Sequence, residues 1–222
     1  MEQTNHKQHR IAIPKYTLGE ELVNSITHGI GAGLGIAALV LCIVKSCSPL
    51  DGYKLASSIV FGLTTTLLYL MSCLYHALKV NKAKRVFRVI DHCTIFLLIA
   101  GTYTPFTLIT MRGLTGWILF GIVWGAAILG IVLNAISLKR FAKMSVFCYI
   151  AMGWVVIFAI KQLVASIDST GLMLLLMGGI AYTLGAVLYA VGSKKRYCHS
   201  VFHVFCLLGT ALHFFAIYLY VL

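Results

Sequence analysis

Hydrophobic residues fill most of this chain in long runs, which are separated by short polar segments. Each run is long enough to cross the roughly 30 Å hydrocarbon layer of a membrane as an α-helix rising about 1.5 Å per residue. Strands of a membrane barrel would be about ten residues long and would alternate apolar and polar positions, and these runs do neither. The pattern therefore predicts seven transmembrane helices, at about 22–44, 55–78, 87–109, 114–136, 144–164, 171–192 and 198–221.

Composition supports the same fold class. The chain has 222 residues, of which 60% are hydrophobic and 11% charged, and its mean hydropathy is +0.93. Soluble domains carry about 25% charged residues, so we expect an all-α integral membrane protein. Residues 1–20 are predicted to form a short polar cytoplasmic tail, and residues 21–222 a single seven-helix domain.

The distribution of lysine and arginine predicts the orientation. Of the 18 such residues, all but Lys45, Lys54, Arg112 and Lys161 lie in the N-terminal segment or in the loops after the second, fourth and sixth runs. Positive charge accumulates in cytoplasmic loops. We therefore expect the N-terminus to be cytoplasmic and the C-terminus to lie outside.

The formal net charge of +12 bears on binding partners. The charges lie between apolar runs, which favours acidic lipid headgroups at the cytoplasmic face as the partner. Nucleic acid is not expected, because no basic patch interleaves with exposed aromatic residues. The sequence does not predict an oligomeric state.

Small residues and one proline predict local helix geometry. Pairs of glycines spaced four residues apart allow helices to approach closely. Pro105 is expected to kink the third helix, because proline removes a backbone hydrogen bond. The paired glycines are Gly29, Gly31, Gly33 and Gly35 in the first run, and Gly121 and Gly125 in the fourth.

Strongly polar side chains inside the runs gather near one end of the predicted bundle. With the orientation above, they lie at the cytoplasmic ends of four helices, and only His213 lies deeper, about 15 Å further along its helix. Ionisable residues inside a membrane are costly and mark a functional site by default. The members of this layer are Glu21, Asn24, His28, Ser72, His76, Asp91, His92, His199 and His203.

Histidine spacing within this layer is typical of a metal site. His199 and His203 are four residues apart, so one helix face presents both imidazoles. A third imidazole, from His76, would leave one position of a tetrahedral zinc open for water, as in catalytic zinc sites. Imidazole ligands are also compatible with copper, nickel and iron.

The segments ELVNSITHG, SCLYH, the DH of RVIDHC, and HSVFH followed by LLGTALHF resemble motifs of the hemolysin III family. That family is the bacterial branch of the progestin and adipoQ receptor superfamily. The resemblance implies a seven-helix protein of the plasma membrane or bacterial inner membrane, with one Zn²⁺ per chain near the cytoplasmic leaflet. It implies His76, His199 and His203 as zinc ligands, Asp91 as the residue that holds the water, and Ser72 beside it.

The superfamily is similar to alkaline ceramidases and is proposed to hydrolyse lipid amides, which makes a zinc-dependent hydrolase of lipid amides or esters our leading hypothesis. Asp91 and Ser72 would be catalytic, and Glu21, Asn24 and His28 would support the ligands or line the entrance. His92 and His213 are weaker candidates, because one hydrogen bond between helices explains either.

Two alternatives remain open. The family name reflects an attributed cytolytic, pore-forming activity. A lipid sensor with a structural zinc would need a closed coordination sphere, for which Cys198 or His28 could supply the fourth ligand.

Overall fold

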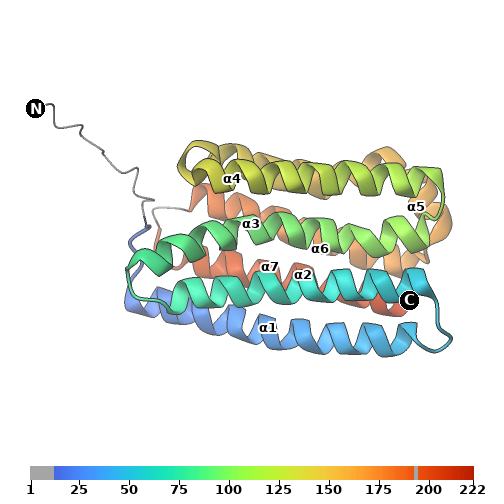
Figure 1. Ribbon diagram of the computed structural model, residues 1–222, viewed down its shortest axis with the longest axis horizontal. Helices are drawn as coiled ribbons and strands as arrows, with labels where there is room; N and C mark the ends of the chain where they lie inside the picture. Colours follow the sequence, from blue (N-terminus) through green and yellow to red (C-terminus); the bar gives the residue numbers. More distant parts are fainter. Residues whose placement is uncertain (1–12, 193–194) are drawn as a thin grey trace, which may run out of the picture.

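The computed structural model describes residues 13–192 and 195–222, and every regular element in these residues is a helix. The all-α prediction is thereby confirmed. Of the predicted tail 1–20, residues 1–12 lie outside the described part, and the first helix already begins at Leu18. The α-helices are α1 (Leu18–Ser46), α2 (Gly52–Ala77), α3 (Lys82–Pro105), α4 (Leu114–Trp154), α5 (Ile160–Ser166), α6 (Ser169–Val191) and α7 (Cys198–Tyr220), as Figure 1 shows. A π-helical turn, Phe106–Thr110, follows α3, and a 3-10 turn, Val155–Ala159, joins α4 to α5.

Within the described residues, six helical segments are long and apolar enough to cross a membrane. The fourth of these, Leu114–Ser166, has 53 residues and would be about 80 Å long as one straight helix. It is not straight: Ser137 has non-helical backbone angles. Beyond this break the Ser145 hydroxyl donates to Asn134 Oδ1 over 2.7 Å, although residues eleven apart in a continuous helix are separated by about 16 Å. The chain therefore reverses direction within α4 (Figure 1).

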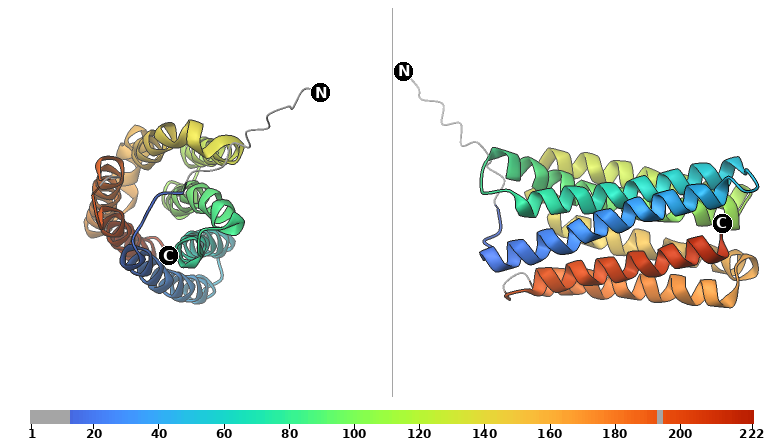
Figure 2. Two further views of the ribbon diagram at one scale, coloured as in Figure 1. Left: turned by 90° about the vertical axis from the view of Figure 1, so that its left-hand side faces the viewer. Right: turned by 90° about the horizontal axis from the view of Figure 1, so that it is seen from below.

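Helices that follow one another in the chain pack side by side, and the first and last helices are also neighbours. α1 contacts α2, α2 contacts α3, and α6 contacts α7, while α7 also contacts α1. The end-on view of Figure 2 shows this arrangement. The start of α1, the end of α2 and the starts of α3 and α7 consequently meet at one end of the bundle, on the left in Figure 1.

The glycines of α1 show which of the predicted close approaches occur. A Cβ atom added at Gly31 would lie 2.7 Å from the ring of Tyr69, and one added at Gly35 would lie 2.9 Å from the Thr66 hydroxyl. A Cβ at Gly33 would have no neighbour within 4 Å. The pair Gly31 and Gly35 therefore faces α2 closely, whereas in the other pair only Gly29 is near α2, with a Cβ at 3.4 Å from Cys73 Sγ.

Two further local predictions have different outcomes. Regular α3 ends at Pro105 and continues as a π-helical turn, Phe106–Thr110, which agrees with the predicted distortion. A close approach at Gly121 and Gly125 is not seen, because a Cβ at either would meet nothing within 4 Å. These two glycines lie on the outer face of α4, away from the helices of the same chain.

Candidate metal centre

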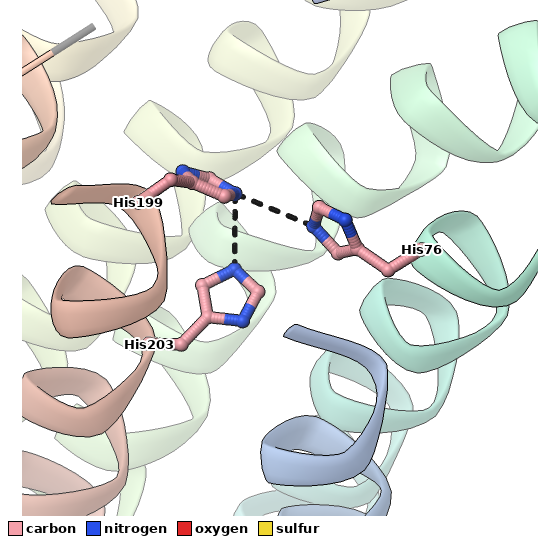
Figure 3. Close-up of side chains that lie close together, drawn as sticks. All are labelled: His76, His199 and His203. Atoms are coloured by element: carbon pink, nitrogen blue, oxygen red, sulfur yellow. Dashed lines mark hydrogen bonds between the residues drawn. The ribbon is translucent and has the colours of Figure 1, made fainter. Parts of the chain in front are cut away.

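Three histidine side chains converge at the end of the bundle where α1, α2, α3 and α7 meet. His199 Nε2 lies 3.3 Å from His76 Nε2 and 3.1 Å from His203 Nε2. His76 and His203 are buried, and His199 is partly buried. Figure 3 shows the three rings pointing their Nε2 atoms at a common centre. We call these residues the histidine cluster.

The helices bring the histidine cluster together from distant parts of the chain. His199 and His203 are one turn apart near the start of α7 and therefore project from the same face. His76 comes from the last turn of α2, more than a hundred residues earlier. The structure thus brings together the three residues that the sequence indicated as ligands.

The spacing of the cluster fits a tetrahedral metal ion. Two ligand nitrogens at 2.0–2.1 Å from such an ion lie about 3.3–3.4 Å apart, close to the distances around His199. A neutral imidazole offers one donor and one acceptor, so His199 Nε2 cannot satisfy both neighbours through a single proton. A cation at the centre would satisfy the lone pairs of all three nitrogens, and the donor set suits zinc.

Two polar side chains of α1 contact α2 and α7 at the histidine cluster. His76 Nδ1 lies 2.7 Å from Glu21 Oε2, so the side of the ring away from the cluster is held by a carboxylate. The Ser200 hydroxyl donates to Asn24 Oδ1 over 2.6 Å. Asn24 Nδ2 also lies 3.4 Å from His76 Nδ1. Glu21 and Asn24 therefore both contact His76, and Asn24 in addition ties α1 to α7.

His28 lies against the cluster but is not arranged as a ligand. Its ring stacks on that of His203, with centroids 3.6 Å apart and an angle of 9° between planes. A metal bound by an imidazole nitrogen lies close to the plane of that ring, and one ion cannot lie in two stacked, parallel planes. His28 is 3% exposed, and among the described residues neither of its ring nitrogens has a hydrogen-bond partner.

A cavity of about 220 Å³ lies beside the histidine cluster. Most of its lining is apolar, and its polar lining includes His199, His203, Ser72 and Asp91. Asp91 is 8% exposed, and within the described part of the chain the Ser72 hydroxyl is buried without a partner. The two predicted catalytic residues thus share one cavity with two members of the histidine cluster.

Comparison with known proteins bears on what this arrangement does. The model of the family described as Haemolysin-III related matches residues 16–214. This chain belongs to the haemolysin-III related family. Hemolysin-3 of Bacillus cereus is 44% identical over 203 residues, covering 91% of this chain and 92% of the relative. The Hemolysin-3 homolog of Bacillus subtilis (strain 168) is 42% identical over 205 residues, covering 92% and 96%.

A more distant relative is the human Monocyte to macrophage differentiation factor, which is 25% identical over 224 residues and covers 97% of this chain and 90% of its own length. No solved structure matches the chain. The resemblance to the hemolysin III family is confirmed, and the chain is a multi-pass membrane protein.

The three weaker candidates of this haemolysin-III related chain lie outside the cluster. His92 Nδ1 is 2.9 Å from the Arg88 carbonyl oxygen, and His213 Nε2 is 3.0 Å from the Leu175 carbonyl oxygen. Cys198 Sγ is 3.8 Å from the Leu188 carbonyl oxygen. Hydrogen bonds to backbone carbonyls therefore account for one polar atom of each side chain.

Two residues at the site were not predicted from the sequence. Tyr16 lies in the segment before α1, which crosses the end of the bundle (Figure 2). Its ring stacks on His199, with centroids 5.1 Å apart and 16° between planes. Burial, and after it the neighbouring Tyr75, raise the pKa of the Tyr16 phenol well above its usual value. The phenol is therefore uncharged where it packs on the His199 ring. The second residue is Lys84, which is 1% exposed.

Proposed function

We propose that this haemolysin-III related protein is a zinc-dependent membrane hydrolase that acts on a lipid amide or ester. The observation that carries the proposal is the histidine cluster, whose nitrogens have the spacing of a metal site and two of whose members line a cavity together with Asp91 and Ser72. The apolar remainder of the cavity is suited to an acyl chain. The site would take one zinc ion per chain.

We also propose that the chain crosses the membrane seven times with its N-terminus in the cytoplasm. The reversal at Ser137 supports two crossings within Leu114–Ser166. The basic residues between Lys79 and Arg88, most of them in the first turns of α3, and Lys195 and Arg196 before α7 lie at the same end as the histidine cluster, which supports a site in the cytoplasmic leaflet. Acidic lipid headgroups are the expected contacts of the exposed members of these segments.

Each polar side chain receives a role in this proposal. Zinc bound at the cluster would supply Lewis acidity, which lowers the pKa of water and polarises a carbonyl group. We assign to Asp91 the acceptance of a proton from water in the cavity, because a carboxylate within reach can act as a general base. We assign to Ser72 a hydrogen bond to the carbonyl oxygen of the lipid, because its buried hydroxyl has no partner among the described residues.

The sensor alternative, with a closed and structural zinc, has less support. His28 is stacked on a ligand ring rather than directed at the common centre, and the Cys198 thiol contacts the Leu188 carbonyl. Neither side chain that could close the coordination sphere is arranged to do so, and an open position is the mark of catalytic zinc sites.

A cytolytic activity is a second candidate, because the name of the Bacillus cereus relative indicates it. A direct pore would need polar side chains along the full length of several helices. Here the cavity is lined mainly by apolar groups. Leakage of a dye from liposomes at low protein-to-lipid ratios would establish the pore, and retention of the dye would exclude it.

Metal content of the detergent-purified protein tests the hydrolase proposal. We expect about one zinc per wild-type chain by elemental analysis, loss of zinc in His76→Ala and His199→Ala, and near-complete retention in Asp91→Ala. The Asp91→Ala protein should then fail to hydrolyse ceramide-like and acyl-ester substrates that the wild type cleaves. Wild-type protein free of metal, when prepared without chelators, would refute the proposal.

A further inference from the structure

A buried lysine is linked to the histidine cluster through a carboxylate. Lys84 Nζ lies 2.6 Å from Glu21 Oε1, and the other oxygen of the same carboxylate lies 2.7 Å from His76 Nδ1. The side chain of Lys84 is 2% exposed and that of Glu21 is 17% exposed. The three residues therefore form a chain of contacts that runs from α3 through α1 to α2.

The surroundings of Lys84 hold it in one place. Its ammonium group also donates to the Leu78 carbonyl oxygen over 2.9 Å and lies 5.1 Å from the centre of the Tyr75 ring. Burying an ammonium ion is costly unless its protons are paired. A position with a carboxylate, a carbonyl and an aromatic face is therefore specific for a cation.

The position of the Glu21 carboxylate affects His76 Nε2, the ring nitrogen that faces the histidine cluster. His76 Nδ1 lies 2.7 Å from Glu21 Oε2 and 3.4 Å from Asn24 Nδ2. Because the contact to the carboxylate is the shorter one and a carboxylate only accepts, we take Nδ1 to carry the proton and Nε2 to present its lone pair toward His199. Partners of this kind fix the tautomer and the orientation of a ligating imidazole. Without a cation beside it, the carboxylate of Glu21 would move toward water and release the ring.

We propose that Lys84 is a positioning residue for metal binding, acting through Glu21 on His76; this inference rests on the metal site of the proposed function. Lys84 does not touch the metal or the lipid. It holds the Glu21 carboxylate where it keeps the His76 ring in the tautomer and orientation that complete the histidine cluster.

The test is the zinc affinity of the purified full-length protein, measured by competition with a chromogenic chelator. We expect Lys84→Met to weaken zinc binding about 10- to 100-fold, the range found when partners of metal ligands are removed, and Lys84→Arg to restore most of it. Lys82→Met is the matched control. Lys82 is exposed and lies in the same helical turn as Lys84, and its substitution removes the same charge. It should bind zinc like the wild type.

A double mutant separates action through Glu21 from a general effect on packing. If Lys84 acts through Glu21, adding Lys84→Met to Glu21→Gln should weaken binding little further. The visible spectrum of Co²⁺-loaded Lys84→Met should also differ from that of the wild type, because the position of one ligand changes. Glu21→Gln alone carries the test if Lys84→Met does not fold, and an unchanged affinity in Glu21→Gln overturns the inference.

Three other results would also contradict the proposed role of Lys84. Wild-type affinity in Lys84→Met, an equal loss in Lys82→Met, or losses that multiply in the double mutant would each overturn the inference while leaving the metal site intact. A wild-type protein that binds no zinc would overturn the proposed function together with this inference, so the two failures are distinguishable.

Discussion

Each ring of the histidine cluster is held by a different neighbour. His76 is held by a hydrogen bond to Glu21, His203 by the stacked ring of His28, and His199 by the stacked ring of Tyr16. Stacked rings fix orientation through packing, without a donor or an acceptor. We therefore expect the shape of these neighbours to matter more than their polarity at two of the three ligands.

Substitution of His28 tests this expectation. His28→Phe keeps an aromatic ring against His203 and removes two buried nitrogens that have no partner among the described residues. We expect zinc stoichiometry and affinity to be retained and the thermal midpoint to be equal or higher, because an unsatisfied buried polar group costs about 1–3 kcal/mol. His28→Ala, which removes the ring, should weaken zinc affinity roughly tenfold. If His28 were a ligand, both variants would lose the metal.

The sequence indicated the members of the histidine cluster better than the groups that contact them. His199 and His203 follow from their spacing on one helix, and the ordered motifs point to His76. The contacts of Tyr16 and Lys84 could not be read in this way, because they depend on how a segment before α1 and the first turn of α3 lie against other helices. Lys84 was assigned to a basic loop, whereas burial gives it a different role.

At the scale of helices, polar side chains cap the N-termini of four helices. Thr17 accepts a hydrogen bond from the Glu20 backbone and Glu20 returns one, which forms a capping box at the start of α1. Side chains of Asp51, Asn81 and Asp168 cap α2, α3 and α6. The apolar runs located the helices, whereas glycine spacing predicted contacts less well, because it does not reveal which face of a helix meets a neighbour.

Two glycines of α1 provide a matched test of helix packing. A methyl group at Gly31 would clash with Tyr69 at 2.7 Å and with Leu207 at 2.8 Å, and Tyr69 cannot move easily because its hydroxyl is bonded to Thr210. We expect Gly31→Ala to lower stability by about 1–3 kcal/mol, as overpacking does. Gly33→Ala has open space and should be neutral or up to about 1 kcal/mol stabilising, because alanine favours the helix. Thermal unfolding in detergent compares the two, and equal midpoints would contradict the packing described here.

At the scale of the whole molecule, most basic residues belong to one end, and two of the four exceptions bond to the end of α7. Lys45 and Lys54 donate to carbonyl oxygens of Tyr218 and Leu222 near the end of α7. A cation at a helix C-terminus offsets the partial negative charge of the helix dipole. These two lysines therefore stabilise the end of α7 and do not weaken the charge asymmetry that predicts orientation.

The proposed orientation predicts which thiol reacts from outside. Cys47 is exposed in the connection between α1 and α2, at the end opposite the histidine cluster. In spheroplasts expressing the chain, a membrane-impermeant maleimide should label the wild type, and Cys47→Ser should lose most of that labelling. Labelling of Cys47 that appeared only after the membrane was permeabilised would show that the chain is inserted the other way round.

The division of the histidine cluster between α2 and α7 has a consequence for biosynthesis. His76 and His199 are 123 positions apart, so helices α1 to α6 are all synthesised before the histidines of α7 emerge from the ribosome. Until α7 packs beside α1, the growing protein has one ligand and no metal site. Under the proposed function, zinc would therefore be acquired only after α7 is inserted, and metal occupancy would mark the end of assembly. A chain arrested after α6 would keep His76 and its supporting residues and would remain metal-free.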